Sequence, residues 1–128
     1  MKILVASCDK DTDIFDAFHY CMEKYWKNHP EIIYATETVQ NPYYKTISYD
    51  IPLELWTKRM RKTIEDIDDD KILFMVDDCF IRDYVDVDRI NYVEENLKDN
   101  IALFNFEKSW DANDLMSSYK GFKRRMPR

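Results

Sequence analysis

The chain alternates short apolar runs with stretches in which apolar residues recur every three or four positions. Continuous apolar runs at 2–6, 31–36, 71–76 and 101–106 predict buried β-strands, and the run at 71–76 is the clearest of them. An alternating segment at 45–49 predicts a further short strand at a sheet edge. Helical spacing predicts helices over 14–26, from Pro52 to about residue 65, and over 87–98.

The order of these elements predicts the fold class. Apolar strands alternating with amphipathic helices favour an α/β domain with a mostly parallel sheet, in which the strand at 71–76 is central and buried. Right-handed crossovers then give a Rossmann-like three-layer α/β/α arrangement. The expected apolar stripe of the second helix consists of Leu53, Trp56, Met60 and Ile64.

Ligands of such sheets bind at the carboxyl ends of the strands. The loops after residues 6, 36 and 76 are therefore the places where functional side chains are expected. One glycine in 128 residues excludes both a P-loop and a G-x-G-x-x-G fingerprint, so any nucleotide would have to be held in another way.

Composition and charge narrow the class of protein further. An apolar fraction of 45% supports a folded core, and a net charge of −6 argues against a nucleic-acid partner, although residues 120–128 carry five bases and no acids. Three cysteines fit no zinc signature and favour a reducing, cytoplasmic location. No signal peptide, transmembrane segment or lipidation motif is expected.

Two adjacent carboxylates, Asp77 and Asp78, directly follow the strand at 71–76. Neighbouring carboxylates at a strand end repel each other and lose solvent, and a hard cation such as Mg²⁺ or Mn²⁺ relieves both effects. The same cation could bridge to a diphosphate. The alternative is that both acids are solvated loop residues or helix caps.

The acidic loop after the first strand has several possible roles. It is not an EF-hand, because residue 14 is not Gly and residue 20 is not Glu. One interpretation is a solvated loop with a helix cap at Asp13. Another is contact of residues 7–9 with a nucleotide base or ribose. A third is a phosphotransfer domain in which Asp9 or Asp11 accepts phosphate.

The second helix carries a tryptophan and an arginine on nearly the same face. We expect Trp56 to pack in the core rather than stack on a ligand. Arg59 lies beside the predicted stripe, so it either extends along the apolar surface to solvent or points at a phosphate or carboxylate. His19 and His29 pair with no Ser or Cys at a spacing typical of nucleophilic catalysis.

Three motifs occur in a characteristic order. They are Ser7-Cys8-Asp9-Lys10 followed by a helix ending in Tyr25-Trp26, then Trp56-x-x-Arg59-Met60, and then the segment 72–81 with its adjacent acids. In order and spacing they resemble the N-terminal half of a small family of bacterial and phage glycosyltransferase-like proteins with a GT-A-type fold. The resemblance covers roughly residues 2–106.

The resemblance implies a site for a nucleotide-diphospho-sugar, with a UDP-sugar favoured and a glycan or protein as acceptor. The loop of Ser7, Cys8, Asp9 and Lys10 would lie by the base and ribose, and Trp56 and Arg59 would line the same cleft. Asp77 and Asp78 would replace the family's DxD element and bind Mn²⁺ or Mg²⁺, with Asp78 favoured as the ligand. The pair is adjacent here, whereas the family's pattern is Asp-x-Asp.

We therefore expect residues 1–106 to form a nucleotide-diphospho-sugar-binding domain. Residues 107–128 would be a basic extension towards an acceptor-binding half that the family possesses and that these 128 residues do not include. The expected function is a glycosyltransferase-like donor domain, suited to binding more than to turnover. The alternative is a non-enzymatic Rossmann-like interaction module with no nucleotide ligand, whose basic tail docks an acidic partner.

Overall fold

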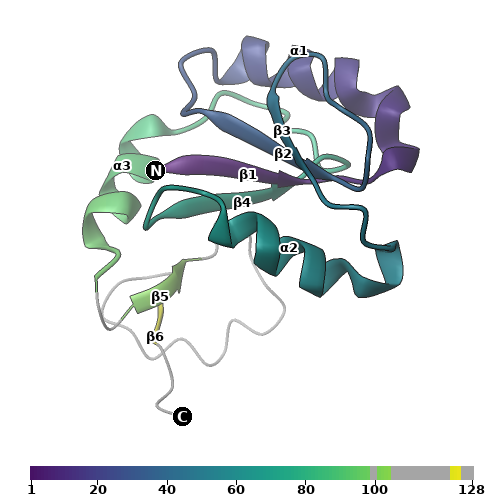
Figure 1. Ribbon diagram of the computed structural model, residues 1–128. Helices are drawn as coiled ribbons and strands as arrows, with labels where there is room; N and C mark the ends of the chain where they lie inside the picture. Colours follow the sequence, from purple (N-terminus) through teal and green to yellow (C-terminus); the bar gives the residue numbers. More distant parts are fainter. Residues whose placement is uncertain (99–100, 105–121, 125–128) are drawn as a thin grey trace. The chain divides into compact units, whose positions relative to one another are not determined.

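The computed structural model describes residues 1–98, 101–104 and 122–124 (Figure 1). Four strands form one parallel sheet in the order β3-β2-β1-β4, and their bounds are β1 Lys2–Ala6, β2 Ile32–Thr36, β3 Lys45–Ser48 and β4 Ile72–Val76. This arrangement confirms an α/β fold with a parallel sheet. It also confirms β3 as a short edge strand.

The helices include three at the places where the apolar periodicity predicted them and a 3₁₀ helix over residues 9–14, a segment for which the sequence predicted a polar loop. Their bounds are η1 Asp9–Ile14, α1 Phe15–Tyr25, η2 Leu53–Leu55, α2 Trp56–Glu65 and α3 Val87–Asn96. Pro52 stands just before the short turn η2 that leads into α2, because its fixed φ suits a helix start and it has no N–H to leave unpaired.

The chain divides into two compact units, Met1–Val85 and Asp86–Arg128. In the second unit, the Asp86 carboxylate caps α3 by accepting a hydrogen bond from the Arg89 backbone N–H at 3.0 Å. Strands β5 (Ile101–Phe104) and β6 (Phe122–Arg124) pair antiparallel in a sheet of their own. The sequence predicted β5 but not β6. Residues 105–106 of the predicted strand, and residues 107–121 and 125–128 of the predicted basic extension, lie outside the described residues.

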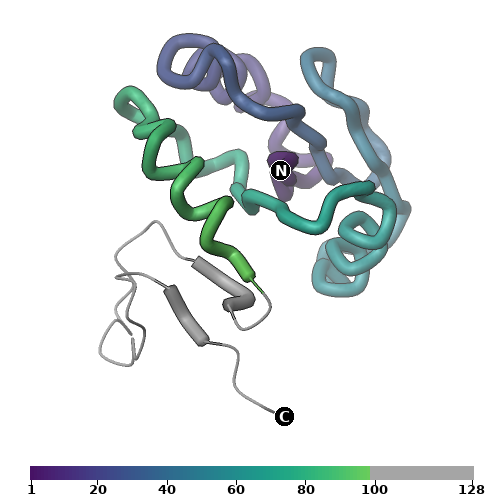
Figure 2. The backbone as a smooth tube through the Cα atoms, turned by 90° about the vertical axis from the view of Figure 1, so that its left-hand side faces the viewer, coloured from purple at the N-terminus to yellow at the C-terminus, as the bar shows by residue number. Residues whose placement is uncertain are grey.

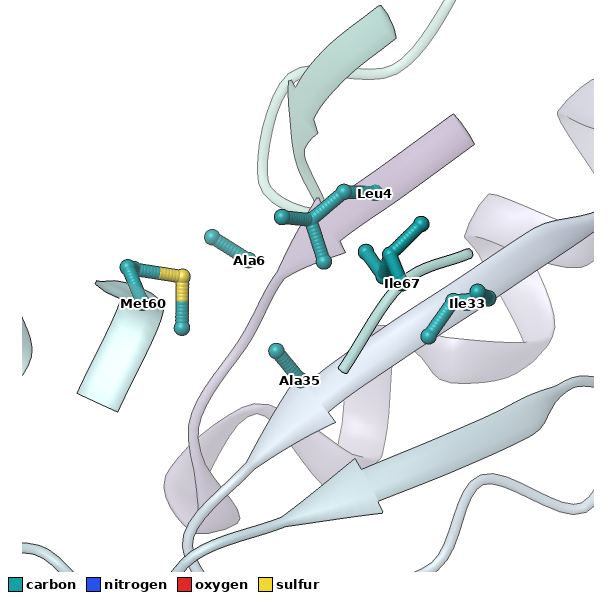
Figure 3. Close-up of a cluster of buried hydrophobic side chains, with 6 residues drawn as sticks. All are labelled: Leu4, Ala6, Ile33, Ala35, Met60 and Ile67. Atoms are coloured by element: carbon teal, nitrogen blue, oxygen red, sulfur yellow. The ribbon is translucent and has the colours of Figure 1, made fainter. Parts of the chain in front are cut away.

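Within the first unit, α1 and α2 lie against opposite faces of the sheet, as Figures 1 and 2 show. On the face towards α2, Leu4 and Ala6 of β1 stand beside Ile33 and Ala35 of β2 in parallel register, and Met60 packs against them (Figure 3). On the opposite face, Tyr34 of β2 meets the rings of Phe15 and Phe18 edge-on, with centroids 5.3 and 5.5 Å apart. These two apolar layers fix both helices to the sheet.

The prediction of which face of α2 is buried is wrong. Of its four members only Met60 is buried, whereas Leu53 and Ile64 are about half exposed. The buried face carries Arg59 and Thr63 beside Met60. Thr63 is accommodated on this face because its hydroxyl donates to the Arg59 carbonyl oxygen at 3.0 Å.

The expectation of a central, fully buried strand at 71–76 is also wrong for the described sheet. There β4 is an edge strand, and Phe74 at its centre is 45% exposed. An apolar run predicts that the side chains of a strand will be buried, but it does not predict which other element will pack against them. Trp56 packs edge-on against Phe74, with the two ring centroids 6.2 Å apart.

The described residues contain no helix that is both long and apolar enough to cross a membrane.

Candidate functional site

The carboxyl ends of three strands bring polar segments to one edge of the sheet. Residues 7–11 follow β1, residues 37–39 follow β2 and residues 77–78 follow β4. Arg59 reaches the same edge from α2. Because parallel strands end together, these segments are neighbours even though they are far apart in the sequence.

Arg59 is the charged centre of this edge, and its side chain is 0% exposed. Its Nη2 donates to the Ser7 carbonyl oxygen at 2.8 Å, and its Nη1 lies 3.3 Å from Oε1 of Glu37 in an ion pair. Of the two possibilities that the sequence left open, Arg59 therefore points at a carboxylate. A buried guanidinium requires such a partner, because removing a charge from water costs several kcal/mol.

Glu37 also connects Arg59 to the loop after β1. Its second oxygen, Oε2, accepts the Asp9 backbone N–H at 2.6 Å. In return the Asp9 carboxylate accepts the backbone N–H groups of Thr38 and Val39, both at 2.9 Å, and the Thr38 hydroxyl at 2.6 Å. Two loops are thus clasped by four hydrogen bonds that run in both directions.

The pKa of the Asp9 carboxyl group agrees with these hydrogen bonds. Burial raises the pKa of its carboxyl group, but the hydrogen bonds from Thr38 and Val39 outweigh burial and lower the pKa to about 2. The sequence assigned Asp9 to nucleotide contact. In the structure its carboxylate holds the loop after β2, so any contact with a nucleotide would come from other atoms of the loop or from a rearranged loop.

Asp77 is the second buried charge-bearing group at this edge and is 2% exposed. Burial, helped by the nearby charges of Asp11 and Asp78, raises the pKa of its carboxyl group, and a hydrogen bond from the Ser7 side chain lowers it; the net result is a pKa of about 6. Its Oδ2 atom has no hydrogen-bond partner among the described residues. The neighbouring Asp78 is exposed.

The other predicted site residues, Cys8, Lys10 and Trp56, take no part in the hydrogen bonds described above. The Cys8 thiol donates to Oδ2 of Asp11 at 3.1 Å, and its burial together with this hydrogen bond raises its pKa, which argues against a reactive thiolate. Lys10 is exposed on the same loop. Trp56 is 37% exposed and packs on Phe74 rather than on the clasped loops.

The structure therefore brings Ser7 together with both Arg59 and Asp77, and it links Asp9 to Arg59 through Glu37. Glu37 is the member that the sequence did not reveal. The loop after residue 36 was expected to carry function, but a single acid at the end of an apolar strand has no spacing pattern that distinguishes it from a solvated residue.

Within the described ranges, no group of three or more His, Cys, Asp or Glu side chains is placed to hold a metal ion. A cation at Asp77 and Asp78 would take its other ligands from water or from a bound phosphate, as Mg²⁺ commonly does.

Comparison of the chain with protein-family models, with curated proteins and with solved structures gave no match in any of the three cases.

The buried ion pair of Arg59 and Glu37 predicts that replacing Glu37 destabilises the protein much more than replacing an exposed glutamate. Glu37→Gln leaves the Arg59 charge buried without a counter-charge, and we expect it to lower the free energy of unfolding by about 2–4 kcal/mol. Glu65→Gln removes the partner of Arg61 in an exposed pair, and we expect no measurable change. Urea denaturation at pH 7 compares the two, and equal effects would show that Arg59 does not depend on Glu37.

The raised pKa of Asp77 predicts a pH-dependent gain in stability on its replacement. Between its ordinary pKa near 4 and about 6, the folded protein holds this proton more tightly than the unfolded chain, so ionisation of Asp77 lowers stability as the pH rises. Asp77→Asn cannot ionise. We expect its unfolding free energy to match the wild type at pH 4 and to exceed it by about 1–3 kcal/mol at pH 7.5.

Urea denaturation at the two pH values measures this difference. A gain of the same size at both values, or a loss at pH 7.5, would contradict a raised pKa for Asp77.

Proposed function

We propose that the first unit is a GT-A-like, three-layer Rossmann-like domain that binds a nucleotide-diphospho-sugar, with a UDP-sugar favoured, through a divalent cation. The observation that carries the proposal is the buried Asp77 carboxylate, whose Oδ2 has no partner among the described residues and which stands beside the exposed Asp78 at the carboxyl edge of a parallel sheet. This edge is where ligands of such folds bind.

The donor set of this edge fits a hard cation. Asp77 and Asp78 would hold Mn²⁺ or Mg²⁺, since both ions prefer carboxylate oxygens and accept one or two from the protein. The raised pKa of Asp77 supports this assignment, because a nearby positive charge would favour the ionised carboxylate that burial disfavours. When bound, the cation would neutralise negative charge on a leaving diphosphate.

The clasped loops would serve as the nucleotide platform. Arg59 has no exposed surface, so in this proposal it does not contact the diphosphate. It orients the Ser7 carbonyl group and, through Glu37, the Asp9 amide. The exposed Lys10 is the residue of the Ser7–Lys10 loop that is free to meet a phosphate or ribose, and Trp56 would contribute only if the ligand extends along α2.

A glycosyltransferase also needs an acceptor site and, in many cases, a catalytic base. We assign neither to the described residues, so the proposed role is donor binding, and transfer to a glycan or protein acceptor would use further elements.

The second candidate is an interaction module without a nucleotide ligand. It is favoured by one observation: the carboxylate of Asp9 is already satisfied by Thr38 and Val39, as expected for a loop whose polar groups are purely structural. In that case Asp77 and Asp78 would bind no cation.

Calorimetric titration with UDP, in the presence and absence of Mn²⁺, tests the proposal. We expect binding only with Mn²⁺, and a more than tenfold loss of affinity in Asp78→Asn, because a directly coordinating carboxylate is removed. Asp68→Asn is the matched control, since it removes an exposed acid in the loop between α2 and β4 and should bind like the wild type. Other nucleoside diphosphates test base selectivity.

Two results would contradict the donor-site proposal. One is the absence of heat with every nucleotide from a protein with native circular dichroism. The other is binding that neither Mn²⁺ nor Asp78→Asn changes.

A further inference from the structure

Tyr34 carries a hydroxyl group into the apolar layer beneath α1. The residue is 0% exposed, and its ring packs against the rings of Phe15 and Phe18. Its hydroxyl group has no hydrogen-bond partner among the residues that the structure describes. Burying a hydroxyl group in this way costs stability, and packing alone would be served as well by a phenylalanine. The hydroxyl group therefore calls for an explanation other than the fold.

The strand register places Asp77 on the same face of the sheet as Tyr34. Ala6 of β1 belongs to the apolar cluster on the α2 face (Figure 3), and Val76 of β4 packs against that cluster. The Asp77 N–H donates to the Ala6 carbonyl oxygen at 3.3 Å, so the pairing of the two strands continues as far as Asp77. Because successive side chains of a strand alternate between its faces, those of Ser7 and Asp77 lie on the α1 face.

Two carboxylates lie near the Tyr34 hydroxyl group. Burial raises the pKa of this hydroxyl group, and the negative charges of Asp77 and Asp11 raise it further. The Asp11 charge also contributes to the raised pKa of Asp77, whose Oδ2 atom is the other buried oxygen on this face without a partner among the described residues. Polar groups from β2, from the end of β4 and from η1 are thus neighbours, and their negative charges favour a positive ion.

We infer that Tyr34 is a positioning residue of the cation site, and that its hydroxyl oxygen accepts a hydrogen bond from a water molecule held by the cation. The inference rests on the proposed function and adds to it that the cation is bound on the α1 face of the sheet. Hard cations prefer carboxylate, carbonyl and water oxygens, and Mg²⁺ usually keeps several of its waters. A neutral phenol hydroxyl group therefore suits a cation-bound water better than the ion itself.

The hydroxyl group would act by fixing the position of the ion relative to Asp77. Water bound to a cation donates a strong hydrogen bond, because the positive charge draws electrons from the water. Groups that hydrogen-bond to the ligands of a metal ion orient those ligands and raise the affinity of the site. This role accounts for a buried hydroxyl group at a position where packing alone favours phenylalanine.

Mn²⁺ binding to the whole chain, followed by electron paramagnetic resonance with and without UDP, tests the inference. We expect Tyr34→Phe to lower the Mn²⁺ affinity about tenfold, because a partner of the metal ligands is lost. In the metal-free protein, we expect the urea midpoint of this variant to equal or exceed that of the wild type, because no hydrogen bond within the described residues is removed. A merely structural hydroxyl group would lower the midpoint and leave Mn²⁺ binding unchanged.

Tyr44→Phe is the matched control. Tyr44 stacks on Tyr34, with the two ring centroids 5.6 Å apart, but its hydroxyl group has a partner, since it hydrogen-bonds with Nδ1 of His19 at 3.0 Å. Removing that hydroxyl group should lower the urea midpoint and leave the Mn²⁺ affinity unchanged. The two variants should therefore show opposite effects.

A nuclear magnetic resonance experiment on the wild type tests the position of the cation without any variant. Mn²⁺ broadens the signals of nearby nuclei, so the ring signals of Tyr34 should broaden before those of Tyr20, an exposed tyrosine of α1. A wild type that binds no Mn²⁺, with or without UDP, would overturn both the proposed function and this inference. Binding that Asp78→Asn weakens and Tyr34→Phe does not, or Tyr34 signals that stay sharp as Mn²⁺ binds, would overturn the inference alone.

Discussion

The architecture of the carboxyl edge depends on one buried positive charge. The Arg59 guanidinium is removed from solvent between α2 and the sheet, and such a charge is tolerated only where oxygen atoms surround it. The Ser7 carbonyl oxygen and the Glu37 carboxylate meet this requirement from the ends of two adjacent strands. A single side chain therefore contacts the chain at the points where it leaves both β1 and β2.

Hydrogen bonds, and not apolar contacts, connect Arg59 to the rest of the two loops. Glu37 fixes the Asp9 amide, and the Asp9 carboxylate in turn fixes Thr38 and Val39. Ser7 joins the two buried charge-bearing groups of the edge, since its carbonyl oxygen contacts Arg59 while its side chain hydrogen-bonds to Asp77. Such a network holds its members in fixed orientations, and for the proposed donor site this would reduce the ordering that ligand binding requires.

The elements of the fold were largely predictable because short apolar runs and helical spacing are local signals. The sequence did not predict correctly which face of α2 is buried or which strand lies at the edge of the sheet. The stripe of α2 was assigned by hydrophobicity, and this rule missed that Arg59 and Thr63 face inward, where Arg59 donates to the Ser7 carbonyl oxygen and Thr63 donates to the Arg59 carbonyl oxygen. For β4, the same apolar run that predicted a strand could not predict that it would lie at the edge of the described sheet.

The sequence predicted which loops meet at the carboxyl edge of the sheet, but only some of the residues that interact there. The expectation that functional side chains follow the strands named three loops that the structure brings to one edge of the sheet, and Ser7, Asp77 and Asp78 lie there. That these residues bind a ligand stays a prediction. Glu37 was not found, because its role depends on its distance from a residue 22 positions further along the chain. Ion pairs between distant segments leave no spacing pattern in a single sequence.

The central claim is that the charges of Arg59 and Glu37 act together to organise this edge. A double-mutant cycle with Arg59→Met, Glu37→Gln and the double variant, followed by urea denaturation, measures their coupling directly. If the two act as a pair, the double variant will be more stable than the sum of the single losses predicts, by more than about 1 kcal/mol, because neither charge is then left alone. Losses that add to within about 0.5 kcal/mol would show that the two side chains act independently and would contradict the account.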